Sequence, residues 1–248
     1  MVEFLYDDSL APITSEFGFL ECEAKTAANE FYQWQSQIHS KYKKRNLEFE
    51  DIVCTSLKYT LEFLLPLRRG DHTKHLFIPT LNNRWVGCFD NGWQGTDATT
   101  LISVLAEKIG CRGVRVAWSP NTIKKAPNTK RGWKGRYGAV IFDVFGPKPN
   151  PILNYLRTVE LINDGKWDFI TGGEPFDFEE TERYELPRKT DRFTPEMLDS
   201  YLKHLGIDAF SEDFYLTTKE NPAKLISLKG DLGYEVKEYT LEQARENY

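Results

Sequence analysis

Residues 84–118, RWVGCFDNGWQGTDATTLISVLAEKIGCRGVRVAW, contain the pattern that decides the fold. The apolar runs at 84–89 and 114–118 are typical of short buried strands. The loop at 90–95 contains Asn-Gly and a second Gly, which favour a turn. Thr96 or Asp97 then caps a helix that Gly110 closes. One side of this helix is apolar and consists of Leu101, Ile102, Leu105 and Ile109. The segment therefore predicts a strand, a loop, a helix and a second strand.

Two further helices and a third strand follow from the same kind of pattern. Apolar residues recur at three- and four-residue steps over 23–42, and again over 195–205 after a Thr194 cap. Residues 139–145 form another apolar run typical of a buried strand. Helices and hairpins alternate irregularly, which favours an α+β fold with a mostly antiparallel or mixed central sheet and helices packed on it. We find no linker and expect a single domain, residues 1–248.

The second half of the chain contains further strand patterns. Residues 157–163 and 166–171 flank Asn163-Asp164-Gly165, a sequence that favours the tight turn of a β-hairpin. Tyr184–Pro187 is expected to add a short strand. The tail is expected to form a hairpin around Lys229-Gly230-Asp231, followed by a short helix.

The composition indicates a folded protein and argues against two functional classes. The 248 residues include 16 Phe, 12 Tyr and 6 Trp, more large apolar surface than disordered chains carry. A net charge of −5 argues against a general nucleic-acid coat. No run approaches the roughly 20 apolar residues of a membrane helix, and the first residues do not form a secretory leader. The four cysteines are far apart, which favours reduced thiols and a cytoplasmic location.

The loop between the strand at 84–89 and the following helix is the first candidate site. A helix N-terminus offers unpaired amide groups that can hold an anion. Asp90 and Asp97 are alternatively candidates for an acid, a base or a metal ligand. The competing interpretation is structural: Asn91-Gly92 makes the turn and Asp97 caps the helix.

No metal or cofactor is expected from the motifs. His72-x-x-His75 is the only close pair of histidines, and two ligands are too few for a structural zinc site. The chain contains no dinucleotide-binding, phosphate-binding or zinc-protease motif and no nucleophile elbow.

A basic segment covers residues 119–137 and contains six cations, two aromatic residues and no acid. Cations interleaved with aromatic rings suit a phosphate backbone with stacked bases, or an acidic protein partner. A solvated loop is the structural alternative. The candidate binding residues are Lys130, Arg131, Trp133, Lys134 and Arg136.

An acidic segment at residues 174–182 is the opposite feature. Its acids alternate with two phenylalanines, a pattern that suits docking against a basic surface. Glu179 and Glu180 are also candidates for catalysis or for cation binding. A solvated edge strand or loop is the structural alternative. The candidate binding residues are Phe176, Asp177, Glu179, Glu180 and Glu182.

Several short stretches resemble uncharacterised soluble bacterial proteins of the toxin-immunity type. They are 76–80, 84–85, 89–92, 95–97 and 191–194 with the helix that follows. The resemblance covers about half of the chain and assigns no catalytic residue. It implies a protein that neutralises a partner toxin.

The sequence leads us to a hypothesis with two alternatives. The leading one is a non-enzymatic, cytoplasmic immunity-type protein that binds a protein partner, such as a toxin domain, through the charged segments. The first alternative is a small enzyme, a hydrolase or a nucleotide-modifying transferase, centred on Asp90 and Asp97. The second is a nucleic-acid-binding protein that uses the basic residues at 124–136.

Overall fold

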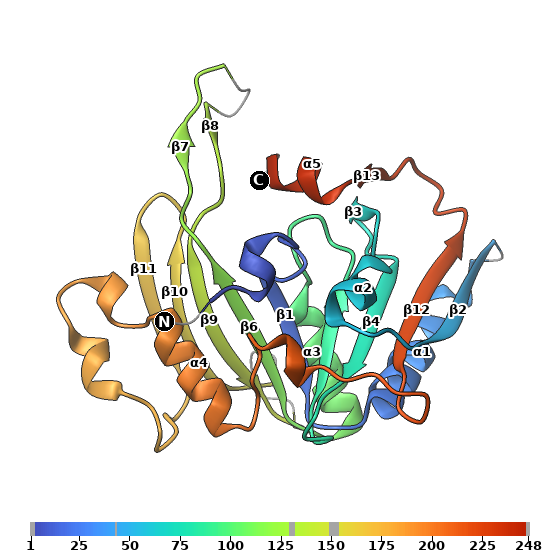
Figure 1. Cartoon of the computed structure of the whole chain (residues 1–248), viewed down its shortest axis with the longest axis horizontal. Coiled ribbons are helices and arrows are strands. Elements are labelled where there is room, and N and C mark those ends of the chain that lie inside the picture. The colour runs from blue at the N-terminus through green and yellow to red at the C-terminus, as the bar shows by residue number, and fades with distance from the viewer. Residues whose placement is uncertain (1–2, 43, 129–131, 149–153, 247–248) are drawn as a thin grey trace.

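The computed structural model describes residues 3–42, 44–128, 132–148 and 154–246, and nine of the described strands form one large sheet (Figure 1). The strands lie in the order β11-β10-β9-β6-β1-β5-β4-β12-β2, and every neighbouring pair is antiparallel. Their bounds in chain order are β1 (Glu16–Leu20), β2 (Arg45–Ile52), β4 (Lys74–Pro79), β5 (Val86–Asp90), β6 (Gly113–Ser119), β9 (Ala139–Phe145), β10 (Tyr155–Asn163), β11 (Trp167–Gly172) and β12 (Ala223–Gly230).

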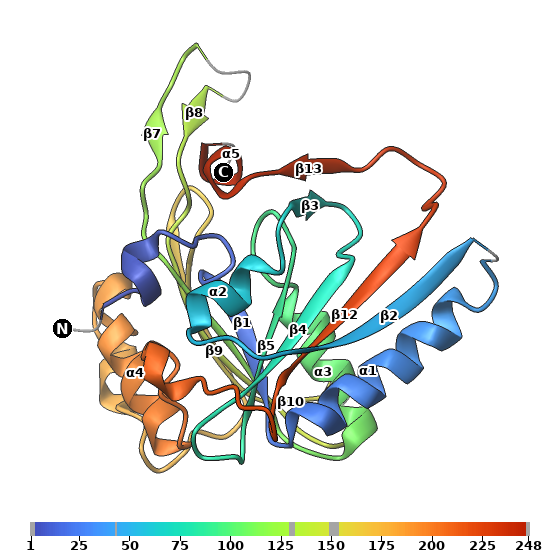
Figure 2. The ribbon, with the colours of Figure 1, turned by 45° about the vertical axis from the view of Figure 1, so that its right-hand side comes forward.

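Helices cover both faces of this sheet (Figures 1 and 2). α1 (Ala24–His39) and α3 (Ala98–Ile109) share one apolar core with one face. α2 (Leu57–Glu62) and α4 (Pro195–His204) pack into a second, larger core on the other face. Short 3-10 helices occupy Leu5–Asp8, Thr181–Glu185, Lys189–Asp191 and Glu212–Phe214. The predicted α+β fold class is therefore confirmed, with a sheet that is antiparallel throughout.

Two small ladders lie outside the large sheet. β3 (Leu67–Arg69) pairs with β13 (Lys237–Tyr239), which precedes α5 (Leu241–Glu246). β7 (Lys124–Lys125) pairs with β8 (Trp133–Lys134). This second ladder stands out from the body of the molecule beside α5 (Figures 1 and 2). We call its described part, residues 122–128 and 132–136, the basic ribbon.

Two glycines determine how closely α3 packs on the sheet. A Cβ atom on Gly18 of β1 would lie 2.3 Å from Cγ1 of Ile102, and one on Gly113 of β6 would lie 2.3 Å from Cγ2 of the same residue. Only a residue without a side chain leaves room for Ile102 at these positions. The helix ends at Gly110, whose left-handed backbone (φ 78°) suits glycine. The position of α3 on the sheet also fixes the loop that leads into the N-terminus of this helix.

Most of the predicted elements are confirmed, and two are wrong. The helices predicted at 23–42, 97–109 and 195–205 and the strands at 84–89, 114–118 and 139–145 are present. Tyr184–Pro187 is not a strand, because the 3-10 helix Thr181–Glu185 turns Tyr184 into the core. The tail forms no hairpin at 229–231, because β12 pairs with β2 and β4 and ends at Gly230. Long-range pairing thus overrides the local turn sequence.

A cluster of charged side chains, buried at Asp143 and half-buried at its neighbours, lies on the face of the sheet that α3 covers in part. Nη1 of Arg115 on β6 donates to Asp143 on β9 at 3.1 Å and to Glu160 on β10 at 3.3 Å, while its Nε donates to Glu16 on β1 at 2.8 Å. Three carboxyl groups therefore share one guanidinium. Burial, reinforced by the charge of Glu160, raises the pKa of Asp143 to about 7.

Candidate functional site

Asp90 lies at the end of β5, and its buried carboxylate organises the loop that leads to α3. Oδ1 accepts from the amide of Gly92 at 2.8 Å. Oδ2 accepts from the amide of Asp97 at 3.1 Å and faces Nδ1 of His72 at 2.8 Å. Because charge-assisted bonds of this kind fix both oxygens, Asp90 is held in place rather than free to move.

Asp97 is the N-cap of α3, one of the two residues, with Thr96, that the sequence predicts for this role. Its Oδ1 accepts from the amide of Thr100 at 3.3 Å, while Thr96 accepts the amide of Asp90 through its hydroxyl at 3.1 Å. The side chain of Asp97 is exposed. The helix N-terminus therefore faces two carboxylates of the protein itself, and this opposes the binding of an external anion there.

The two histidines of the His72-x-x-His75 pair differ in protonation. Burial acts to lower the pKa of His72, but the hydrogen bond and charge of Asp90 outweigh it, so the net shift is upward. His75 lies on β4 opposite Asp90, and burial lowers its pKa to about 4. At neutral pH, His75 is thus an uncharged ring beside a histidine that holds its proton more tightly.

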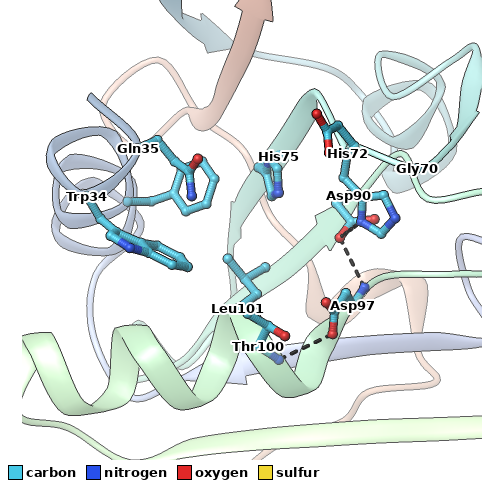
Figure 3. Close-up of a pocket in the computed structure, with 11 residues that line it drawn as sticks. Trp34, Gln35, Gly70, His72, His75, Asp90, Asp97, Thr100 and Leu101 are labelled. Carbon is cyan, nitrogen blue, oxygen red and sulfur yellow. Dashed lines mark hydrogen bonds and ion pairs between the residues drawn. The ribbon is translucent and has the colours of Figure 1, made fainter. Parts of the chain in front are cut away.

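These side chains line a cavity of about 270 Å³ between α1, α3 and the sheet (Figure 3). Phe31, Trp34 and Gln35 of α1 form one wall, and Thr100 and Leu101 of α3 form another. The ring of His75 packs on Phe31 with 4.3 Å between centroids, and Figure 3 shows it between the α1 side chains and Asp90. We call this cavity the histidine pocket.

The histidine pocket brings together residues that the sequence analysis kept apart. In the sequence, Asp90 and Asp97 belong to one loop and His72 and His75 to one closely spaced pair, and no pattern connects the two. The antiparallel pairing of β4 with β5 places His75 opposite Asp90, and this pairing brings the histidines to the two aspartates. In the described part of the chain, no group of three or more His, Cys, Asp or Glu residues is arranged to hold a metal ion. An imidazole held by a buried carboxylate can transfer protons.

The basic ribbon divides the predicted basic residues into two groups. Lys124 lies opposite Lys134, and Lys125 opposite Trp133, and all four are exposed. Arg136 at the base of the ribbon is buried instead. It forms an ion pair with Asp8 and donates to the hydroxyl of Ser15 at 2.8 Å.

Lys130 and Arg131, the other two predicted binding residues of this segment, lie outside the described residues.

A cavity of about 460 Å³ separates the ribbon from the C-terminal helix α5. Lys124 and Lys134 line it from the ribbon, and Arg245 lines it from α5, with Glu246 as the one acid among the described lining residues. Nη1 of Arg245 donates to the carbonyl of Ser9 at 3.0 Å, which ties α5 to the N-terminal segment. We call this concave, cationic surface the basic groove.

The acidic segment is folded into the protein at its centre. The side chain of Glu179 is fully buried and accepts from Arg157 Nη2 at 2.6 Å, from the hydroxyl of Tyr184 at 2.8 Å and from the amide of Phe176 at 3.0 Å. Phe176 and Phe178 stack on each other at 5.1 Å and pack against the larger core.

The remaining acids of this segment lie at the surface. Asp177 and Glu182 are exposed, and Glu180 forms a surface ion pair with Arg183 at 3.6 Å. The structure therefore places Glu179 in an internal ion pair, whereas Asp177, Glu180 and Glu182 remain accessible to a partner.

No family model matches the sequence, and neither a curated protein nor a solved structure matches it significantly. None of the helices in the described ranges is long and apolar enough to cross a membrane. All four cysteines are free thiols.

Proposed function

We propose that the chain is a non-enzymatic binding protein of the immunity type, which docks an acidic protein partner through the basic ribbon and the basic groove. The observation that carries this proposal is the placement of the cations. Lys124 and Lys134 project on a ribbon that stands clear of the body, and Arg245 completes a concave surface beside them. Like charges raise the local potential and accelerate encounter with a partner of opposite charge.

The residues of the ribbon are not those that would stabilise it best. Lysines directly opposite each other across a ladder are destabilising, by about 0.2–1 kcal/mol. A two-stranded ladder is also marginally stable in isolation, and Lys124 and Lys134 face each other on just such a ladder. Half-exposed Trp133 beside them provides the kind of aromatic surface that anchors protein interfaces. These features favour a role in binding over a role in folding.

A cytoplasmic location and a toxin domain as partner are part of the same proposal. The free cysteines support the location, since reduced thiols persist in the cytoplasm. The resemblance to immunity-type proteins supports the partner class.

The test uses proteins encoded by genes next to that of this chain, produced singly and together with it. We expect one of them to be toxic alone and harmless with the chain, and to bind it in surface plasmon resonance. A Lys124→Glu/Lys134→Glu variant should associate about 10-fold more slowly or worse, with a weaker dependence on salt.

The matched control reverses two exposed lysines elsewhere, Lys25 on α1 and Lys219 near β12. The Lys25→Glu/Lys219→Glu variant should associate within about 2-fold of the wild type, because distant exposed charges act weakly at physiological salt. Equal rates for the two double variants would overturn the docking proposal. Binding of DNA or RNA that the ribbon variant alone abolishes would instead support the nucleic-acid alternative.

The enzymatic alternative has one specific observation in its favour, the 2.8 Å contact between His72 and Asp90 at the edge of a cavity. A carboxylate that orients a histidine is a recurrent element of acid–base sites. A Asp90→Asn variant that remains folded and still neutralises the partner would count against this alternative.

A further inference from the structure

The charge of the histidine pocket is negative. Asp71, Asp90 and Asp97 contribute three carboxyl groups, and none of the described residues that line the cavity is a lysine or an arginine. Among the described lining residues, His72 is the side chain most able to carry a positive charge, and its Nδ1 already faces Asp90 at 2.8 Å. A negatively charged site of this kind favours the binding of cations and opposes the binding of anions.

Two polar groups in the pocket have unused hydrogen-bonding capacity. Oδ2 of Asp97 accepts no hydrogen bond within the described residues, since the cap of α3 uses only Oδ1. The ring nitrogens of His75 likewise have no hydrogen-bond partner in the described part of the chain, although the ring packs against Phe31 of α1. A neutral imidazole offers one acceptor nitrogen, which suits an N–H donor.

The α1 wall supplies an aromatic surface. Trp34 lies partly exposed in the cavity and meets Phe31 edge-on, with centroids 5.9 Å apart and planes at 85°. The face of an indole ring attracts a cation placed over it. The volume of about 270 Å³ is just below the roughly 300 Å³ at which pockets for drug-sized ligands begin. The space suits one small group or one side chain.

We infer that the histidine pocket is a binding site for an organic cation, a guanidinium or a primary amine, held between Trp34, His75 and Asp97. Its donors face the free oxygen of Asp97 and the acceptor nitrogen of His75, and its planar or alkyl part lies against Trp34. The cation belongs either to a small free molecule or to an arginine or lysine side chain of a protein. This inference does not depend on the basic ribbon, which lies on another part of the molecule (Figure 2).

The test is a titration at pH 8 with four probes: agmatine, the peptide Gly-Gly-Arg-Gly-Gly, the neutral analogue butylurea and inorganic phosphate. Binding is followed by isothermal titration calorimetry and by the proton NMR signals of the rings of His72 and His75. We expect agmatine to bind and to shift both histidines, and butylurea to bind at least about 5-fold more weakly because it carries no charge. Tighter binding of agmatine than of the peptide indicates a small-molecule ligand, and the reverse order indicates a protein side chain.

Two variants locate the site, and one serves as a control. Asp97→Asn keeps the helix cap but removes the charge, and should weaken agmatine binding about 5-fold. Trp34→Leu should weaken it by a similar factor through loss of the aromatic face. The control Asp164→Asn removes an exposed carboxylate from the β10–β11 turn and should have no effect.

Two outcomes would overturn the inference. One is phosphate binding more tightly than agmatine. The other is agmatine binding that is absent at millimolar concentration or equal in Asp97→Asn and Asp164→Asn. If Trp34→Leu fails to fold, Asp97→Asn alone decides between these outcomes.

Discussion

The basic ribbon and the acidic segment have the same design in the sequence, with charges of one sign interleaved with aromatic residues, yet the fold treats them in opposite ways. The cations of the ribbon lie opposite each other in solvent, with half-exposed Trp133 beside them. The acidic segment turns its two phenylalanines into the core and its central carboxylate toward a buried arginine. Composition is thus a poor guide to accessibility, and the availability of a partner determines which charge is buried.

The difference between the two regions is that only the acidic segment has a buried counter-ion. Arg157 on β10 reaches Glu179 through Nε and Nη2 and the carbonyls of Gly172 and Gly173 through Nη1, so the buried charges neutralise each other and their hydrogen bonds are made. Lys124 and Lys134 lie opposite each other on their ladder, and neither forms an ion pair with another described residue. Four substitutions test this contrast.

The largest effect is expected for Glu179→Gln. Removing the charge leaves the guanidinium of Arg157 buried without its counter-ion, so the free energy of unfolding should fall by about 3–5 kcal/mol. Urea denaturation followed by fluorescence measures it. Glu182→Gln changes an exposed acid of the same segment and should alter stability by less than about 0.5 kcal/mol. A similar loss for both variants would show that Glu179 is not special, and would contradict the contrast drawn above.

The next largest effect is expected at Arg136, where the ribbon joins the body of the protein. Arg136 is buried and bonded to Asp8 and Ser15. Arg136→Met should therefore lower the free energy of unfolding by about 2–3 kcal/mol, because Asp8 loses its partner and a buried hydroxyl loses its donor. Thermal unfolding of this variant beside Lys125→Met measures the difference. If Arg136→Met is as stable as Lys125→Met, the whole segment is a surface loop.

Asp143 is a buried acid that differs from Glu179, because it shares its arginine, Arg115, with two other acids. Its pKa of about 7 in the folded chain lies above the ordinary value of 3.8. Folding therefore favours the protonated form. The stability contributed by this group is complete below pH 4 and is lost as the pH rises to about 7.

Asp143→Asn keeps this position neutral at every pH. We expect it to match the wild type near pH 4 and to be more stable by about 1–2 kcal/mol at pH 8, equivalent to a melting temperature about 2–8 °C higher. Glu16, Glu160 and Arg115 face this position and remain in the variant. Thermal unfolding across this pH range measures the effect, and a variant that loses stability at pH 8 would show that Asp143 is needed as a charge.

Much of the fold could be predicted from local patterns, whereas the site could not. The helix at 97–109 has its cap, apolar side and closing glycine within 15 consecutive residues, so the sequence alone was sufficient. β2 has mostly exposed residues and no clear alternation, and it is a strand only because β12, some 180 positions later, pairs with it.

The site depends on contacts of this long-range kind. His72 is 18 residues from Asp90, and Trp34 comes from a helix much earlier in the chain, so no spacing rule connects them. The same reason explains Glu179: its side chain is buried because it pairs with Arg157, which lies 22 positions earlier in the chain, on β10.

The smallest effect on stability separates binding from folding in the ribbon. Lys134→Glu places a carboxylate opposite Lys124 and replaces a repulsive cross-strand pair by an attractive one. The ribbon should become more stable by about 0.2–1 kcal/mol. This is measured locally by hydrogen exchange at the amide of Thr122, which donates to the carbonyl of Arg136.

The same change, Lys134→Glu, should slow association with an acidic partner, because the basic groove loses a cation and gains an anion. If the lysine were present for stability, a variant with a more stable ribbon would associate with the partner as fast as the wild type or faster. A gain in stability together with slower association therefore indicates a role in binding. Faster exchange at Thr122 in the variant, or unchanged association, would mean that the facing lysines are not maintained for docking.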